Sequence, residues 1–170
     1  MMLPSHATPI RIERLNLPPS RDHLAPDPET TALITRIVAL EIASGLSTRG
    51  EQSYYSIANE PAHLILLARS GRSESDLVGV FAACIVLDEL QIDNLAVRAD
   101  QRGQGIGSLL VANGLTRARQ AGCQMAILEV RSANRAARML YQKSGFEEVG
   151  KRPRYYQNPP DDAITMICQL

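Results

Sequence analysis

The sequence has no tryptophan, few other aromatic residues and only three cysteines among 170 residues. Cys84, Cys123 and Cys168 are far apart and form no C-x-x-C pair. This spacing argues against a disulfide framework and against a zinc site, so we expect free cysteines and no metal. Unpaired cysteines are typical of a reducing compartment, which predicts a cytoplasmic protein.

Neither sign of charge is in excess, because 18 Lys and Arg residues balance 18 Asp and Glu residues. This balance argues against a nucleic-acid binder held by bulk positive charge, although a small basic patch is compatible with it. No apolar run approaches the roughly 20 residues needed to cross a bilayer. The first residues, Met-Met-Leu-Pro, do not form a charged-then-apolar signal. We therefore expect partners that are neither nucleic acids nor membranes.

The length and the hydrophobic content of 45% fit one globular domain. We expect residues 1–8 to form a flexible N-terminal tail and residues 9–170 to form a single domain. No oligomeric contact is evident in the sequence, so a monomer or a weak dimer is expected.

The apolar pattern predicts an α/β fold, with a mixed sheet of about seven strands and about four helices on both faces. Strands are expected over residues 10–15, 63–68, 77–87, 90–97, 125–131, 146–151 and 163–168. Helices are expected from residue 30 to Gly45 and over residues 51–58, 105–120 and 134–143. Prolines 18, 19, 26 and 28 predict a loop before the first helix. The three strands between residues 63 and 97 are joined so briefly that they should be antiparallel.

A glycine-rich loop follows the strand that ends at Val97 and reads Arg102-Gly103-Gln104-Gly105-Ile106-Gly107-Ser108. Backbone N–H groups at a helix start can hold phosphate oxygens, and glycine lets them approach closely. The dinucleotide motif needs glycine where Ser108 stands, and the P-loop motif needs lysine where Ile106 stands. From the residues alone, a phosphate loop and a plain glycine-rich turn stay equally open.

Glu129 and Tyr141, two polar residues in apolar surroundings, are candidates for acid–base chemistry. In the strand over residues 125–131, Glu129 shares a face with Ile127 and Arg131. A carboxylate buried in an apolar strand suits a general base. The alternative is a surface or ion-paired glutamate, with Arg131 as a possible partner.

Asn134 and Tyr141 lie two helical turns apart on one face, with the small Ala137 between them. This stripe could present an amide and a phenol to an extended cofactor arm. The alternative is that Tyr141 is a core aromatic residue packed with Leu140 and Phe146.

The glycine-rich loop resembles the coenzyme A pyrophosphate loop of the GNAT superfamily of acyltransferases, whose pattern is Arg/Gln-x-x-Gly-x-Gly/Ala. Arg102, Gly105 and Gly107 match this pattern in order. The resemblance implies the GNAT fold and acetyl-coenzyme A as the cofactor, with its pyrophosphate on the amides of residues 103–108. It further implies that the backbone of residues 95–97 runs beside the pantetheine arm like an added strand. The cofactor contacts so implied are Leu95, Ala96, Val97, Arg102, Gly103, Gln104, Gly105, Ile106, Gly107 and Ser108.

A longer stretch resembles RimI-type enzymes, bacterial N-terminal acetyltransferases that modify a small-subunit ribosomal protein. The match covers about residues 77–168 and includes Leu-Glu-Val-Arg-Ser-Ala-Asn at residues 128–134, Leu140-Tyr141 and Gly145-Phe146. The resemblance implies a protein N-terminal α-amine as acceptor. The implied site residues are Glu129 as the base, Tyr141 as the acid, Asn134 beside the pantetheine, and Tyr155 and Tyr156 along the peptide groove.

The first 75 residues show little of the RimI pattern and lack its aromatic-proline segment. Two other functions therefore stay open, which are acetylation of a free small amine and non-catalytic binding of acyl-coenzyme A. For Tyr155 and Tyr156, packing on an edge strand is the alternative to binding a peptide.

Overall fold

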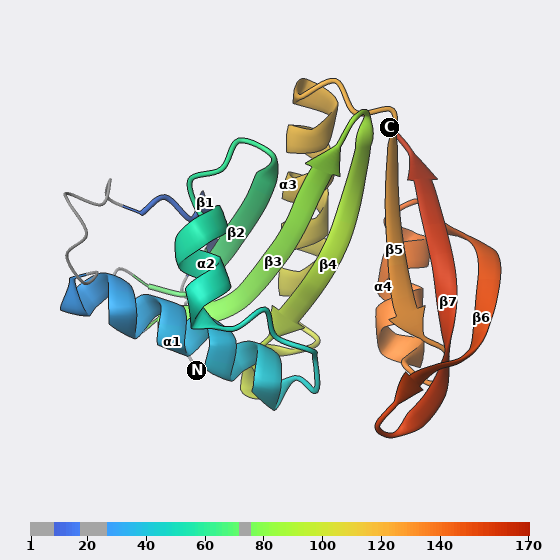
Figure 1. Cartoon of the computed structure of the whole chain (residues 1–170), viewed down its shortest axis with the longest axis horizontal. Coiled ribbons are helices and arrows are strands. Elements are labelled where there is room, and N and C mark those ends of the chain that lie inside the picture. Colours follow the sequence, from blue (N-terminus) through green and yellow to red (C-terminus); the bar gives the residue numbers. More distant parts are fainter. Residues whose placement is uncertain (1–8, 18–26, 72–75) are drawn as a thin grey trace, which may run out of the picture.

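The computed structural model describes residues 9–17, 27–71 and 76–170, and Figure 1 shows their arrangement. The expected N-terminal tail, residues 1–8, lies outside these ranges. So do three of the four prolines assigned to the first loop, at positions 18, 19 and 26.

The fourth of these prolines, Pro28, was wrongly assigned to the loop and is the first residue of a helix. Asp27 precedes the helix, and its carboxylate accepts hydrogen bonds from the N–H groups of Glu29 and Thr30 at 3.0 and 2.9 Å. Proline suits the first helical position because its missing N–H would have no partner there. The helix therefore begins two residues earlier than its apolar pattern indicated.

The fold is a seven-stranded mixed sheet with four α-helices, as the sequence predicted. The strand order is β1-β2-β3-β4-β5-β7-β6, with β4 and β5 parallel and the other neighbours antiparallel. The elements are β1 (Arg11–Arg14), α1 (Pro28–Ala43), α2 (Glu51–Ile57), β2 (His63–Arg69), β3 (Leu77–Val86), β4 (Glu89–Val97), the 3-10 helix η2 (Ala99–Gln101), α3 (Ile106–Gln120), β5 (Met125–Arg131), α4 (Arg135–Lys143), β6 (Glu147–Gln157) and β7 (Pro160–Gln169).

The helices divide between the two faces of the sheet (Figure 1). Helices α1 and α2 cover β2, β3 and β4, and the buried cluster on this side includes Ile34, Ile37 and Tyr54. Helices α3 and α4 cover the opposite face, over a larger cluster that extends to β5 and β7. Among the described elements, no helix covers β5, β7 and β6 on the α1 side (Figure 1). One face of this half of the sheet is therefore open.

Helix α3 lies close to the sheet because Gly114 has no side chain. A Cβ atom at this position would lie 2.6 Å from Cζ of Phe81, which is fully buried in β3. A contact that short requires the phenylalanine ring or the helix to move.

The last two strands are longer than predicted. β6 extends to Gln157, and β7 begins at Pro160, so only Asn158 and Pro159 separate them. Almost every residue of β6 is exposed, and its pairing with β7 is irregular in two places. A strand of this kind has no apolar alternation from which its end can be read.

Strand β4 contains a β-bulge that the sequence pattern did not predict. Ala82 pairs with Asn94 and Ala83 pairs with Ile92, so Asp93 is the extra residue. The bulge reverses the alternation of side chains, because Ile92 packs on the α3 side whereas Asn94 points toward α1. The second half of β4 thus presents a different face from the one that a regular strand would present.

Candidate active site

Strands β4 and β5 separate along part of their length (Figure 1). Their parallel pairing ends at Ile92 and Leu128. Beyond this pair, β4 continues to Val97 alongside β3, and no described strand pairs with its other edge. An extended ligand can add to such an edge through main-chain hydrogen bonds. The segment 95–97, where the pantetheine contacts are expected, lies on this edge.

The loop between β4 and α3 presents a row of unpaired backbone N–H groups. Gly103 and Gly105 have positive φ angles of 75° and 82°, which glycine adopts without strain. No side chain in the described ranges caps the start of α3. The N–H groups of residues 103–108 donate to no described residue, and the first helical bond runs from the Leu109 N–H to the Gly105 carbonyl. Such a row is suited to bind an anion such as a pyrophosphate.

Two residues of the loop motif have structural contacts that the sequence did not reveal. Nε of Arg102 donates to the Val97 carbonyl at 2.9 Å, and its Nη2 donates to Oγ of Ser44 at 3.3 Å. A Cβ atom on Gly107 would lie 2.6 Å from Cδ1 of Leu140. Arg102 therefore fastens the loop to β4 and α1, and glycine at 107 allows α4 to pack closely.

The remaining loop residues differ in exposure. Gln104 and Ser108 are exposed, whereas Ile106 is buried in the core cluster below α3. Only the main chain of Ile106 can therefore face a ligand.

Glu129 follows Leu128, the last residue of β5 that pairs with β4, and points to the open face of the sheet. Its side chain is 27% exposed, and its Oε1 accepts a hydrogen bond from Nη1 of Arg152 at 2.6 Å. The Glu129 carboxylate also interacts with the nearby Tyr155 hydroxyl and thereby raises the pKa of Tyr155. The expectation of a carboxylate buried among apolar residues is wrong. The ion-paired alternative holds, but the partner is Arg152 and not Arg131.

Tyr141 projects from α4 into the core on the opposite side of the sheet. It is 6% exposed and packs edge-to-face on Phe146, with ring centroids 5.5 Å apart. Burial raises the pKa of Tyr141 above its ordinary value of 10.0, and the nearby Tyr156 adds to this effect. Its hydroxyl forms no hydrogen bond with a described residue. Tyr141 is thus a core aromatic residue, and its hydroxyl stays protonated at neutral pH.

Four residues on the open face form an arginine–tyrosine cluster, which consists of Arg131, Arg152, Tyr155 and Tyr156. The two tyrosine rings meet edge-to-face at 5.1 Å. Arg131 lies 4.1 Å from the Tyr156 ring centroid, and Arg152 lies 5.2 Å from that of Tyr155. Tyr156 is half-buried, and burial followed by the Glu129 charge raises its pKa. The cluster therefore adjoins Glu129 and leaves Tyr155 47% exposed.

Asn134 is the N-cap of α4. The sequence had instead suggested that it lies within the helix. Its Oδ1 accepts a hydrogen bond from the Ala137 N–H at 3.1 Å. Capping occupies the amide oxygen, so its Nδ2 is the group left for a cofactor contact.

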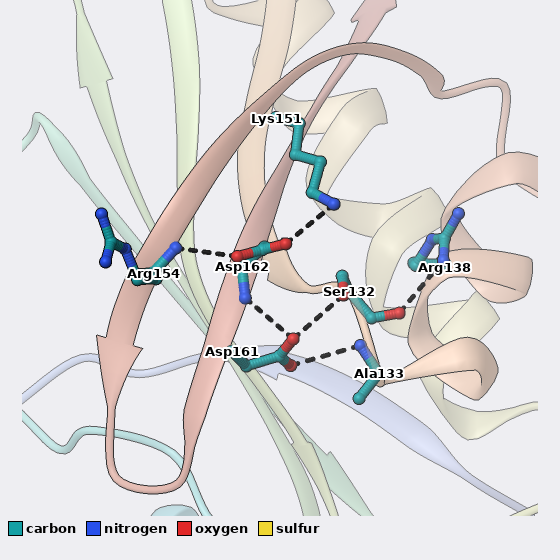
Figure 2. Close-up of polar contacts among 7 residues, drawn as sticks. All are labelled: Ser132, Ala133, Arg138, Lys151, Arg154, Asp161 and Asp162. Atoms are coloured by element: carbon teal, nitrogen blue, oxygen red, sulfur yellow. Dashed lines mark hydrogen bonds and ion pairs between the residues drawn. The ribbon is translucent and has the colours of Figure 1, made fainter.

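A network of two carboxylates supports the cluster, and Figure 2 shows its contacts. Asp161 accepts from Oγ of Ser132 at 2.9 Å and from the Ala133 N–H at 3.2 Å. Asp162 accepts from the Arg154 N–H at 2.7 Å and from Nζ of Lys151 at 2.8 Å. The network joins the end of β5 to the hairpin of β6 and β7. Sequence reasoning missed it because its partners are far apart in the chain.

Asp162 holds the irregular part of β6 in place. Arg154 has a positive φ of 54°, and the pairing of β6 with β7 is interrupted between Arg152 and Tyr156. The Lys151 ammonium, and then the Arg154 N–H, lower the pKa of Asp162. Because the folded-state pKa is lowered, the ionised carboxylate stabilises the fold above its ordinary pKa. This contribution is lost as the pH falls below about 4.

Replacing Asp162 by alanine is expected to lower kcat/KM for the acceptor about tenfold, because Arg152 and Tyr155 lose their support. The difference in unfolding midpoint between wild type and D162A should narrow when urea unfolding is measured at pH 3.5 instead of pH 7. D162N keeps an acceptor for the Arg154 N–H and should retain most of the activity. Equal activity in D162A and wild type would contradict a supporting role.

A second network, buried between α1 and β4, was also missed. Oε1 of Glu41 accepts from the Tyr54 hydroxyl at 2.6 Å and from Nδ2 of Asn94 at 2.7 Å. Asn94 also donates to the Ser47 carbonyl at 3.1 Å. Burial, followed by the bond to Glu41, raises the pKa of Tyr54. The network fixes the segment between α1 and α2, where the sequence departs from the RimI pattern, against the bulge of β4.

Other kinds of site find no support in the described ranges. They contain no group of three or more His, Cys, Asp or Glu side chains that could hold a metal ion. The three cysteines are unpaired, and Cys123 and Cys168 are buried. None of the described helices is long and apolar enough to span a membrane.

Comparison with known proteins gives consistent results. Residues 34–146 match the model of the acetyltransferase (GNAT) family. A Bacillus subtilis protein, named as a candidate [ribosomal protein bS18]-alanine N-acetyltransferase, is 30% identical over 135 residues, which are 78% of this chain and 87% of that protein. The [ribosomal protein bS18]-alanine N-acetyltransferase of Haemophilus influenzae is 39% identical over 101 residues, which are 57% of this chain and 68% of that enzyme.

Solved structures show the same fold. The ribosomal-protein-S18-alanine N-acetyltransferase of Escherichia coli superimposes with a TM-score of 0.74 at 24% identity, over 94% of this chain and 93% of that one. NAA60 of Arabidopsis thaliana superimposes with a TM-score of 0.78 at 17% identity, over 95% of this chain and 98% of that one. The match to the family model and these relatives show that the chain belongs to the GNAT family of acetyltransferases and is an N-acetyltransferase that uses acetyl-coenzyme A.

Proposed function

We propose that the chain acetylates the N-terminal α-amine of a protein, with a ribosomal protein as the preferred acceptor, in the cytoplasm. The names of its relatives support this class of acceptor. The observation that carries the proposal is the position of Glu129 and Tyr141. Glu129 lies on the open face of β5, whereas Tyr141 projects from α4 into the core on the opposite side of the sheet.

The residues fit acetyl-coenzyme A, which would supply the acetyl thioester. The unpaired N–H groups of residues 103–108 would hold the pyrophosphate, and the free edge of residues 95–97 would hold the pantetheine arm. At the start of α4, Nδ2 of Asn134 would donate a hydrogen bond to the pantetheine arm. A backbone N–H of the same β4 edge would polarise the thioester carbonyl.

Glu129 would act as the general base, directly or through one water molecule. An N-terminal α-amine has a pKa near 8, so roughly a quarter of it is neutral at pH 7.5, against about a thousandth of a lysine side chain. The neutral amine can attack, and Glu129 would then take the proton that the nitrogen loses. Because its carboxylate lies on the open face of the sheet, an acceptor can reach it.

Tyr141 would act as the general acid. Burial keeps its hydroxyl protonated, and no described residue accepts its hydrogen bond, so the proton is available to the departing thiolate. Tyr155 and Tyr156 would line the groove for the first acceptor residues. A positioned acid or base typically contributes about 10²–10⁴ in rate.

Mass spectrometry with isotope-labelled acetyl-coenzyme A can test the proposal. The acceptors would be peptides with a free N-terminal alanine, the same peptides blocked at the N terminus but containing lysine, and free amino acids and polyamines. We expect the label on the α-amine of the unblocked peptides. Turnover on the free amines alone would reject a protein acceptor.

A further inference from the structure

We propose that Arg152 is an exchangeable counter-ion of Glu129, which the charged N terminus of the acceptor displaces when it binds. The inference rests on the proposed function, because it takes the acceptor to be a protein α-amine. It assigns Arg152 a role in acceptor affinity, and it makes acceptor binding an exchange of one cation for another.

Arg152 is the cation that contacts Glu129 in the described part of the chain. Its Nη1 lies 2.6 Å from Oε1 of Glu129. The nearby Tyr155 hydroxyl is neutral, with its pKa raised by the Glu129 carboxylate, and Thr165, directly opposite Glu129 on β7, is uncharged. The carboxylate thus has one cationic partner, with Tyr155 and Thr165 as neutral neighbours, before an acceptor arrives.

The other charged and titratable groups nearby are engaged elsewhere. Arg131, on the same strand as Glu129, donates to the carbonyls of Asn158 and Pro159 at 2.9 Å. The Arg131 guanidinium stacks on the Tyr156 ring. Burial and then the Glu129 charge raise the pKa of Tyr156, but Tyr156 forms no hydrogen bond with Glu129. Arg131 therefore does not compete for the Glu129 carboxylate.

The pair can exchange because it is partly exposed. The Arg152 side chain is 60% exposed and that of Glu129 is 27% exposed. Ion pairs with this exposure strengthen binding by no more than about fivefold. Arg152 also lies 5.2 Å from the Tyr155 ring centroid, so it keeps a cation–π contact when it leaves Glu129.

The charges on acceptor and product favour this exchange in the productive direction. Most of an N-terminal α-amine is protonated at neutral pH, so the incoming ammonium and the Arg152 guanidinium compete for one carboxylate. The acetylated product is a neutral amide and cannot hold Glu129. Of the two protons that the bound ammonium loses, the first leaves to solvent before the attack and the second passes to Glu129. When Glu129 has released that proton to solvent, Arg152 returns to its carboxylate, which favours release of the product.

Calorimetry can measure this competition without turnover, on protein saturated with coenzyme A. The ligand is a decapeptide with a free N-terminal alanine, and the same peptide with an acetylated N terminus is the control. We expect R152Q to bind the free peptide about three- to fivefold more tightly than wild type, with KM lowered in the same ratio. The acetylated peptide should bind both proteins equally.

Two variants and a salt series separate this role from a structural one. R152K keeps the charge and should bind as wild type does. R119Q removes an exposed arginine in the last turn of α3 and should also leave the affinity unchanged. Salt should weaken peptide binding more steeply in R152Q than in wild type, because wild type exchanges one cation for another whereas R152Q forms a net ion pair.

Weaker or unchanged peptide binding in R152Q would overturn the inference, provided that wild type acetylates the peptide. If wild type transfers no acetyl group to any peptide N terminus, the proposed function fails first and the inference fails with it.

Discussion

Replacing Tyr141 by phenylalanine is expected to lower kcat by about 10²–10³-fold. The substitution removes only the hydroxyl, and a phenylalanine ring can keep the edge-to-face contact with Phe146. The dissociation constant of acetyl-coenzyme A should therefore stay within about twofold of wild type. A loss in kcat without a loss in affinity is the pattern of an interaction made in the transition state.

Single-turnover kinetics and calorimetry would measure the two quantities for Y141F. Tyr55 offers a matched control, because it is a half-buried tyrosine of α2 that packs against the other core cluster. Y55F should retain wild-type turnover. A Y141F variant with full turnover would remove Tyr141 from the mechanism.

Replacing Gly105 by valine is expected to weaken coenzyme A binding by about 10–100-fold. The φ angle of 82° at this position is strained for any residue with a Cβ, and more so for a β-branched one. Relief of that strain turns the following N–H groups away from their common direction, and the new side chain occupies the space in front of them. The strain alone costs about 1–2 kcal/mol of stability.

Gly122 separates the effect of strain from the effect on the ligand. It lies beyond the other end of α3, its φ is 88°, and an added Cβ would touch nothing within 4 Å, as at Gly105. G122V should lose a similar amount of stability in urea unfolding but should bind coenzyme A as tightly as wild type. Equal affinities in G105V and G122V would contradict a phosphate site at the start of α3.

The division of the chain into elements could be predicted because its signals are local. Periods of two and 3.6 residues, with glycine and proline between them, predicted all seven strands and four helices. The errors lie where local signals fail. Pro28 was assigned to a loop although it begins a helix, and the exposed strand β6 has no apolar face that marks its end.

The candidate site was predicted less completely, because much of it depends on register. The loop glycines, Glu129 and Tyr141 could be named from sequence motifs. The contact between Glu129 and Arg152 could not, since it depends on the irregular pairing of β6 with β7. The bulge at Asp93, which turns Asn94 toward Glu41, depends in the same way on the pairing of β4 with β3.

A crystal structure of the protein with acetyl-coenzyme A would test the central claim most directly. We expect the diphosphate on the N–H groups of residues 103–108 and the thioester between β4 and β5, beyond Ile92 and Leu128 and within reach of Tyr141. A diphosphate bound elsewhere, or β4 and β5 closed along residues 93–97 with the cofactor outside, would contradict it.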